Sequence, residues 1–431
     1  MTWSGKAAPG IVGTASAAEK QVVMVSYWGC FLRDDTGAHA RVRNLVDFLF
    51  PRTPKLIFYS IRQGDGAGGG WTDDKIAEFA RLYPGAELVL ENASKAQKLL
   101  TKARHALLTA MPGSAAPILS FAMPGVSPKL QDLKARYPRM LCVVNYYAGL
   151  GALNGVDVSR TVVECHDVQF VKWRKIHGGA ATDKAVMSRL KREVAALNSV
   201  AGIIAITQRE GNLLEDLLSG PHVFRIPQYG SEIIPVSEKT EPASHDLMFA
   251  ASDNSFNVSG FESFVETGGE WLGKYSIAVC GKICSVPEIR DLADRHPNIS
   301  LLGFVPDIAA LYASSKASLS PVDGTGLKIK VVESLRHGTP VFASEHSMSG
   351  LNAGYEGCVF PLDRAAIEAL LADPVALKKS GEAARSYIGR MSSENPDVQA
   401  LLEFLGLEQG DALQPAEHFS AGRDVAYAVQ M

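Results

Sequence analysis

Short apolar runs alternate with longer amphipathic segments along the chain, which is the pattern of β-α-β units that build a parallel sheet. In the first half, apolar runs predict strands at 21–28, 55–61, 86–92, 116–122, 140–147, 161–167 and 202–207. Helices are predicted at 37–49, 93–110 and 183–200, because apolar residues recur there every three or four positions. These elements predict a doubly wound α/β sheet.

A polar stretch without periodicity around 237–244 interrupts this pattern and predicts a domain boundary. A second, smaller parallel sheet is predicted from strands at 245–252, 275–281, 299–305, 315–322, 339–344 and 357–362. Helices follow at 363–372 and 377–391, and a last helix lies within 392–407. The expected organisation is a flexible leader (1–20), a first Rossmann-like domain (21–236), a second (245–390), and a carboxy-terminal helix and tail (391–431).

Composition agrees with a soluble enzyme of ordinary globular type. Of the 431 residues 46% are apolar and 21% are charged, which argues against a disordered or collagen-like chain. No apolar run is long enough to span a bilayer, and the first 20 residues lack the apolar core of a secretory signal. Six scattered cysteines form no zinc pattern and fit a reducing compartment, so a cytoplasmic protein without disulfides or a bound metal is expected.

Charge is distributed unevenly between the two halves. Residues 1–240 carry 29 Lys and Arg against 21 Asp and Glu, whereas the remainder carries 14 against 25. A basic first half favours contact with something anionic, such as a membrane surface or a phosphate-bearing acceptor. Solvated helix faces explain the same excess equally well.

The segment 320–344 carries the most specific chemical signal. A strand ends near Val322, the turn Asp323-Gly324-Thr325-Gly326 follows, and a helix is predicted to start near Leu327 and to end at Gly338. A helix amino terminus preceded by glycines offers free backbone N–H groups and the positive end of the helix dipole to a phosphate. The cations of Lys328 and Lys330 would add to that site, with charge-assisted hydrogen bonds of about 1.5–3 kcal/mol each.

Helical spacing assigns a further role on the same helix. Lys330 and Glu333 share one face, whereas Leu327, Val331 and Leu335 mark another that can pack inward. A carboxylate below a phosphate-binding helix tip is placed to accept hydrogen bonds from a ribose diol, which makes Glu333 the ribose candidate. An ordinary surface ion pair between Lys330 and Glu333 is the competing explanation.

These residues resemble a known family. GTGLKIKVVESLRHGTPVFAS (324–344), preceded by LLGFVPDIAALYASSKASLSPV (301–322), is similar to the donor-binding signature of retaining glycosyltransferases of the GT-B fold, those of glycosyltransferase family four (group 1). FAASDNSFNVSGFESFV, CHDVQFVKWRKIH and DDTGAHARVRNLVDFL resemble further motifs of that family. The resemblance covers most of 21–390, specifically in 299–344 and weakly in 55–140, and it implies two Rossmann-like domains facing a cleft.

The resemblance also implies which residues hold a nucleotide-diphosphate sugar. The diphosphate and sugar would be surrounded by Gly324, Thr325, Gly326, Leu327, Lys328 and Lys330, with Glu333 on the ribose. Val305 matches the residue whose backbone meets the base, and the opposite wall of that pocket matches Ser252, Asn254, Asn257, Gly281 and Lys282. His166, beside Asp167, which could orient it, matches a histidine that contacts the transferred sugar, and Gly37 matches a loop that approaches the leaving phosphate. The catalytic candidates are His166, Lys328, Lys330 and Glu333.

The implied activity is metal-independent sugar transfer with retention, from a nucleotide-diphosphate sugar to a glycan or lipid-linked acceptor, in polysaccharide biosynthesis. No cofactor and no nucleic-acid partner are expected, and peripheral contact with an anionic membrane fits the basic first half. Thr325 departs from the family, which commonly has a sugar-binding Glu there. A non-catalytic nucleotide-sugar-binding protein of the same fold is therefore an alternative. An NAD-dependent oxidoreductase is a second, although no GxGxxG follows the first strand.

Overall fold

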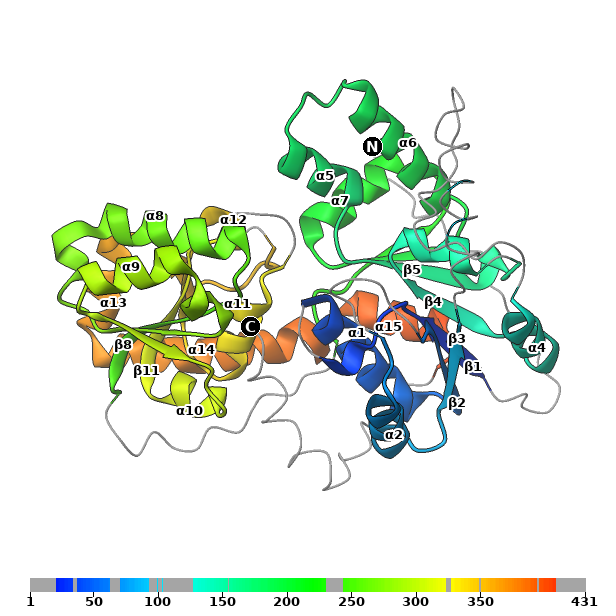
Figure 1. The fold of residues 1–431 in the computed structure, drawn as a ribbon, viewed down its shortest axis with the longest axis horizontal. Coiled ribbons are helices and arrows are strands. Elements are labelled where there is room, and N and C mark those ends of the chain that lie inside the picture. Colours follow the sequence, from blue (N-terminus) through cyan, green and yellow to red (C-terminus); the bar gives the residue numbers. More distant parts are fainter. Residues whose placement is uncertain are drawn as a thin grey trace, which may run out of the picture.

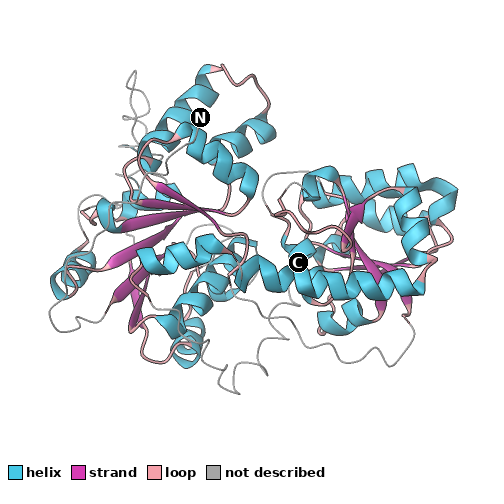
Figure 2. Cartoon of the chain, turned by 180° about the vertical axis from the view of Figure 1, so that it is seen from behind, coloured by secondary structure: helices cyan, strands magenta, loops and turns pink. Residues whose placement is uncertain are grey.

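The computed structural model describes residues 21–33, 37–62, 70–92, 99, 103, 127–153, 155–229, 243–322, 327–348, 350–393 and 395–407. Two parallel sheets, each covered by helices, form two lobes (Figures 1 and 2). The predicted α/β class is confirmed. The strand expected at 116–122 lies outside the described residues, as does nearly all of the helix expected at 93–110.

Among the described residues the first sheet has seven strands in the order β3-β2-β1-β4-β5-β6-β7, all parallel. They are β1 (Val22–Ser26), β2 (Lys55–Ile61), β3 (Glu87–Glu91), β4 (Leu141–Asn145), β5 (Thr161–Cys165), β6 (Gly202–Ala205) and β7 (His222–Arg225). Strand β7 was not predicted. The order reverses between β1 and β4, and in open sheets of this kind ligands bind outside the carboxyl ends of the strands at such a reversal.

The helices of the first lobe are α1 (Gly37–Leu49), α2 (Asp73–Leu82), α4 (Pro128–Arg136), α5 (Gln169–His177), α6 (Lys184–Leu197) and α7 (Gln208–Leu217). Both faces of the sheet are buried. Along β1, Val23 and Val25 enter one apolar cluster whereas Val22 and Met24 enter the other. A strand buried on both sides explains why β1 and its neighbours are continuous apolar runs.

The second sheet has six parallel strands in the order β10-β9-β8-β11-β12-β13. They are β8 (His245–Ala250), β9 (Ile277–Cys280), β10 (Ile299–Gly303), β11 (Ser315–Ser320), β12 (Val341–Ala343) and β13 (Val359–Pro361), so all six predicted strands are present. Its helices are α8 (Ser255–Leu272), α9 (Pro287–Arg295), α10 (Ile308–Ala313), α11 (Ile329–Arg336), α12 (Glu345–Met348), α13 (Arg364–Leu371) and α14 (Pro374–Ser393). The order reverses between β8 and β11.

The last described helix, α15 (Pro396–Phe404), returns to the first lobe. Leu401 and Leu402 are buried in the core of the first sheet. Asp397 accepts a hydrogen bond of 2.7 Å from the backbone N–H of Arg225 on β7, and Asn395 donates one of 2.9 Å to the Arg225 carbonyl. The chain therefore crosses between the lobes at the end of α14, as the orange ribbon in Figure 1 shows.

None of the described helices is long and apolar enough to cross a membrane. All six cysteines carry buried, free thiols.

Candidate functional site

The segment that leads into α11 follows β11, at the reversal of the second sheet. The predicted glycine turn, with Gly324, Thr325 and Gly326, lies outside the described residues. The helix begins at Ile329, two residues later than predicted, and Lys328 is its N-cap residue. Leu327 packs against the cluster that contains Val331 and Leu335, which confirms the predicted inward face.

Lys330 lies against residues of the neighbouring strand and helix. Its Nζ donates a hydrogen bond of 2.7 Å to Oδ1 of Asn257 on α8 and lies 4.6 Å from the ring centroid of Phe249 on β8. The Asn257 amide is oriented in turn, because its Nδ2 donates to the backbone O and the Oγ of Ser252, both at 3.1 Å. Ser252, Asn257 and Lys330, which the sequence assigned to one pocket, thus form one connected group.

Burial, and secondarily the positive charge of Lys328, lowers the pKa of Lys330 to about 7. An ammonium in this position has lost much of its hydration, and its partners within the described residues are one amide oxygen and an aromatic face. An anion that reached Nζ would supply the missing charge, so the lysine is suited to bind a phosphate.

Glu333 lies one turn further along α11 and is buried, with 3% of its surface exposed. Its Oε1 accepts a hydrogen bond of 2.8 Å from Nη1 of Arg336. The surface pair between Lys330 and Glu333, the competing explanation above, is therefore not what the structure shows. Each residue has another partner, and the two side chains belong to different hydrogen-bond groups.

The other predicted wall residues lie at the carboxyl ends of β8, β9 and β10. Asn254 caps α8 by accepting from the N–H of Phe256, so its side chain serves the helix end. Gly281, with φ of 96°, follows β9 and donates its N–H to the carbonyl of Gly303 at 2.8 Å. Lys282 comes next and is exposed, and Val305 follows β10 and is partly buried.

The amino end of α11 reaches the first lobe. A Cβ added to Gly37, the first residue of α1, would lie 2.7 Å from Cδ1 of Ile329. Burial raises the pKa of Glu210 on α7 to about 7, and the charge of Lys328 acts on it in the opposite direction. Gly37 and the cations of α11, predicted on opposite domains, are thus brought together.

His166 follows β5 and is buried. Its Nε2 is 2.8 Å from Oδ1 of Asn145, the last residue of β4, and its ring stacks on Tyr146 with centroids 4.3 Å apart. Asp167, predicted to orient the histidine, accepts a hydrogen bond of 2.7 Å from Lys172. Burial, with smaller effects of Arg41 and Lys172, holds the pKa of His166 well below its usual range, so the imidazole is neutral.

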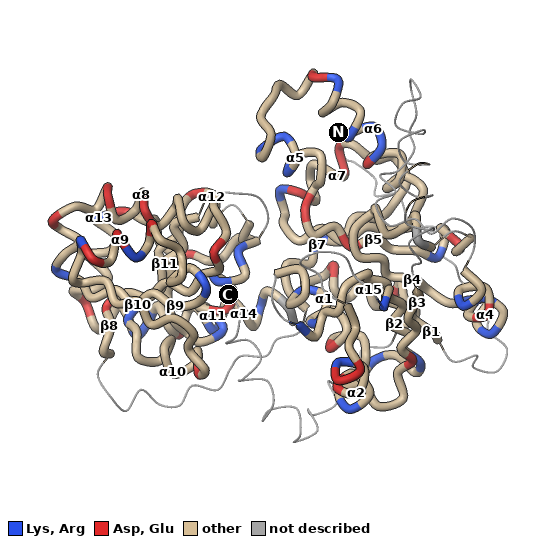
Figure 3. The backbone as a smooth tube through the Cα atoms, viewed as in Figure 1, with Lys and Arg blue, Asp and Glu red and all other residues tan. Residues whose placement is uncertain are grey.

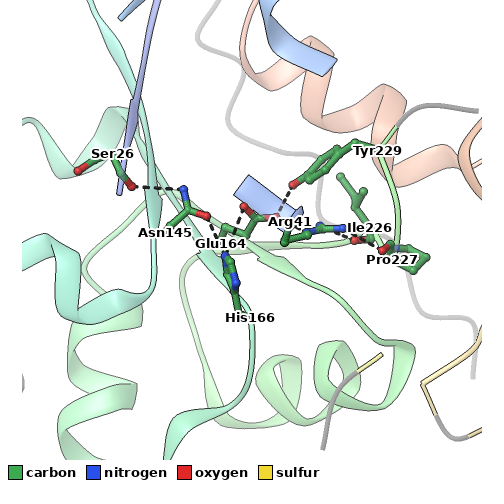
Figure 4. A network of polar contacts seen from close by, with 8 residues as sticks. All are labelled: Ser26, Arg41, Asn145, Glu164, His166, Ile226, Pro227 and Tyr229. Atoms are coloured by element: carbon green, nitrogen blue, oxygen red, sulfur yellow. Dashed lines mark hydrogen bonds and ion pairs between the residues drawn. The ribbon is translucent and has the colours of Figure 1, made fainter. Parts of the chain in front are cut away.

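Sequence reasoning missed a buried network next to this histidine (Figure 4). Glu164 Oε1 accepts hydrogen bonds from Arg41 Nε at 2.7 Å and from the Tyr229 hydroxyl at 2.9 Å. Arg41 also donates to the backbone carbonyls of Pro227 and Ile226, at 2.8 and 2.7 Å. Arg41 and Glu164 are 123 residues apart in the chain, so no local pattern relates them.

The basic residues of the first half are spread over several helices, among them α4, α5 and α6 (Figure 3). On α4, Arg136 forms hydrogen bonds with Glu87 and Asp132, and Lys129 donates to the carbonyl of Leu90. Among the described residues no group of three or more His, Cys, Asp or Glu side chains could hold a metal ion.

Known proteins resemble this chain in sequence and in structure. Residues 244–373 match the model of a family described as Glycosyl transferases group 1. Sucrose-phosphate synthase from Thermosynechococcus elongatus is similar in structure, with a TM-score of 0.59 at 14% identity, over 89% of this chain and 98% of that one. The fold is GT-B.

Two further structures of this fold are similar. S. aureus TarM, solved with fondaparinux, alpha-GlcNAc-glycerol and UDP, has a TM-score of 0.58 at 10% identity over 89% of this chain and 99% of its own. Anabaena HepE, solved with UDP and glucose, has a TM-score of 0.56 at 14% identity over 90% of this chain and 100% of its own. No curated protein sequence matches the chain. The family match over 244–373 supports sugar transfer, and the similar structures show the fold.

Proposed function

We propose that the protein transfers a sugar from a nucleotide-diphosphate sugar to a glycan or lipid-linked acceptor, with retention of configuration and without a metal ion. One observation carries the proposal: the amino end of α11, which carries Lys328 and Lys330, meets α1 of the other lobe through Ile329. Lys330 is held there by Asn257 at 2.7 Å, and Ile329 is so close to Gly37 that an added Cβ would lie 2.7 Å from it. Both lobes can therefore contact a donor bound at this point.

In the proposed reaction, the bond between the anomeric carbon and the diphosphate oxygen breaks while the acceptor oxygen bonds to the same carbon. Negative charge develops on the leaving diphosphate, and groups fixed beside it lower the barrier because they need no reorganisation. Lys328, Lys330 and the backbone of 324–327 would supply that stabilisation. The diphosphate takes the acceptor proton on the same face, so no side chain is assigned as a base.

The remaining roles are those that the family resemblance implies. Glu333 would accept hydrogen bonds from the ribose hydroxyls, with Arg336 holding its carboxylate at 2.8 Å. The base would lie between Val305 and the segment that begins with Ser252. Asn254, Gly281, Lys282 and Leu327 would complete the pocket, and His166 and Gly37 would face the donor sugar and its leaving phosphate.

Binding of the nucleotide is the first test. We expect UDP to raise the melting temperature in a panel of nucleoside diphosphates and to do so less for Lys330→Ala and Glu333→Ala. Lys379→Ala, which removes an exposed lysine of α14 outside the proposed pocket, is the control for the Lys330 variant. If no nucleoside diphosphate shifts the wild-type melting temperature, the donor site is wrong.

Transfer is the second test. Incubation with UDP-glucose and a panel of glycan acceptors should release UDP, in the presence of EDTA, and form a product whose anomeric configuration matches the donor by NMR. Lys328→Ala should lower turnover more than UDP affinity. Nucleotide binding without sugar transfer or UDP release would instead favour the non-catalytic alternative. That alternative is motivated by Thr325, which stands where the family commonly has a sugar-binding Glu. An inverted product or loss of activity with EDTA would contradict retention or metal independence.

Cytoplasmic location and contact with an anionic membrane are proposed together with the lipid-linked acceptor. Helix α5 carries Lys172, Arg174 and Lys175 beside an exposed Ile176, of which 56% is accessible. Each cation near an anionic surface contributes about 1 kcal/mol. Cosedimentation with phosphatidylglycerol vesicles should exceed that with phosphatidylcholine vesicles and fall for the double variant Arg174→Ala/Lys175→Ala. Equal cosedimentation with both lipids would refute the contact.

A further inference from the structure

Asn145 occupies the place where the strand order of the first sheet reverses. It is the last residue of β4, it is fully buried, and it lies between the end of β1 and the loop that follows β5. Its amide joins two of these segments, because Nδ2 is 3.3 Å from the backbone O of Ser26 and Oδ1 is 2.8 Å from Nε2 of His166 (Figure 4). A buried amide bonded on both sides cannot turn without losing both contacts.

The orientation of this amide follows from the chemistry of its neighbours. The backbone oxygen of Ser26 can only accept a hydrogen bond, so the group of Asn145 that faces it must be the NH₂. The amide oxygen then faces His166, and an amide oxygen can only accept. The hydrogen of this contact must therefore be on Nε2 of the imidazole.

A second group favours the same placement of the hydrogen. Oε2 of Glu164 lies 3.9 Å from Nε2 of His166, which is too long for a hydrogen bond but close enough to favour an N–H over a lone pair. Glu164 is itself fixed by Arg41 and Tyr229 through its other oxygen. Since a neutral imidazole carries one hydrogen, Nδ1 has a lone pair and can only accept.

The imidazole ring of His166 is also held by stacking on its face. Tyr146 stacks on His166 with centroids 4.3 Å apart and 28° between the planes, and Trp28 lies beyond Tyr146 at 6.3 Å. Tyr146 has φ of 63°, in the left-handed region, which costs free energy for a residue with a side chain. That cost is offset only by surrounding contacts, of which the stack on the histidine is one. Nδ1 makes no hydrogen bond within the described part of the chain.

We propose that Asn145 is a positioning residue that holds His166 in the Nε2–H form, so that Nδ1 accepts a hydrogen bond from a hydroxyl of the transferred sugar. The proposal rests on the proposed function for the identity of that hydroxyl. The state of the imidazole can be measured without any substrate.

The first experiment is NMR of the ¹⁵N-histidine-labelled full chain at pH 8, with the His166 signals assigned by their loss in His166→Asn. We expect a protonated Nε2 and a bare Nδ1 in the wild type. Asn145→Asp should keep this form, because a carboxylate also accepts from Nε2–H. Asn145→Leu should shift both nitrogens toward a mixture of the two forms. A protonated Nδ1 in the wild type, or no change in Asn145→Leu, would overturn the proposal.

The second experiment separates positioning from folding. With UDP-glucose as donor, kcat/KM of Asn145→Leu should fall about tenfold to a hundredfold, as expected when a reacting group is misplaced. The Kd for UDP, which lacks the transferred sugar, should stay unchanged. Thr161→Val is the control for damage to the sheet. Thr161 lies at the end of β5 away from His166 and is as buried as Asn145, so this variant should leave the histidine spectrum unchanged.

The two hypotheses fail differently. If UDP does not bind to the wild type and no donor is used, the proposed function fails, whereas the NMR result still decides the role of Asn145. If transfer occurs and Asn145→Leu keeps wild-type kcat/KM with UDP-glucose, the positioning role is wrong although the enzyme assignment stands.

Discussion

If Lys330 contacts the diphosphate as proposed, nucleotide binding should depend on pH in a direction that can be calculated. The pKa of Lys330 is lowered to about 7, chiefly because the ammonium is buried beside Phe249 and has Asn257 as its hydrogen-bond partner. At pH 8 about nine-tenths of the side chain is therefore neutral in the empty site. A diphosphate beside Nζ favours the charged form, so binding at pH 8 should take up about one proton.

The magnitude follows from linkage. The complex binds one more proton than the free protein, so raising the pH weakens binding, and one pH unit is worth about 1.4 kcal/mol. Between pH 7.5 and 9.5 the Kd for UDP should rise about tenfold per unit. The second ionisation of a phosphate has a pKa of about 6 and is complete in this range, so it adds no slope. Below pH 7 the pH dependence that Lys330 gives to the Kd disappears, because the lysine is already protonated in the free protein.

Isothermal titration of UDP in two buffers with different ionisation enthalpies measures both the Kd and the proton uptake. Lys330→Arg stays charged throughout, because the guanidinium pKa exceeds 12, and its affinity should be nearly independent of pH. In Lys328→Ala, loss of the neighbouring charge raises the pKa of Lys330, so the weakening should begin at a higher pH. A wild-type Kd that stays constant from pH 7.5 to 9.5, with no buffer dependence, would refute the reasoning.

Three other residues give sharp expectations. Glu333→Leu should destabilise the fold by about 3–5 kcal/mol in denaturant unfolding, because Arg336 would lose its buried carboxylate partner. The double variant with Arg336→Leu should recover stability but not UDP affinity, and recovery of both would contradict the ribose role. Gly37→Val should lower kcat, because the added side chain would crowd Ile329, and the further change Ile329→Ala should restore kcat. An unchanged kcat in Gly37→Val would show that the close approach of the two lobes is not needed for activity. Glu164→Gln should lose about 1–3 kcal/mol of stability, because the charged partner of Arg41 disappears while a hydrogen-bonding oxygen remains; an unchanged melting temperature would show that the network contributes nothing.

The elements that the sequence predicts best are those set by local periodicity. The apolar run at 55–61 coincides with β2, and the amphipathic segment 37–49 coincides with α1. Strand β7 was missed because it has four residues and only its middle two are buried. The return of α15 to the first sheet depends on Asp397 meeting the backbone of Arg225, 172 positions away. Nothing in the local pattern specifies such a partner.

The candidate site divides in the same way. Ser252, Asn257 and Lys330 could be assigned to one pocket by resemblance, and the structure joins them by hydrogen bonds. The partners of Glu333 and His166 could not be predicted, because spacing says which residues share a face but not which contact is made. Helical spacing allowed Glu333 to pair with Lys330 or with Arg336, both three positions away, and the structure forms the second pair.

Burial explains why the junction of the two lobes carries less charge than its residues suggest. Lys330 and Glu210 each have a pKa of about 7, and the pKa of His166 is held well below its usual range, in every case chiefly by burial. Near neutral pH these groups are therefore partly or wholly uncharged in the empty site, with their orientations already fixed by neighbours such as Asn257 and Asn145. Under the proposed function, a diphosphate that enters meets Lys330, which needs to gain a proton but does not need to move. Part of the free energy of binding then depends on the protonation of this lysine, so pH probes the site directly.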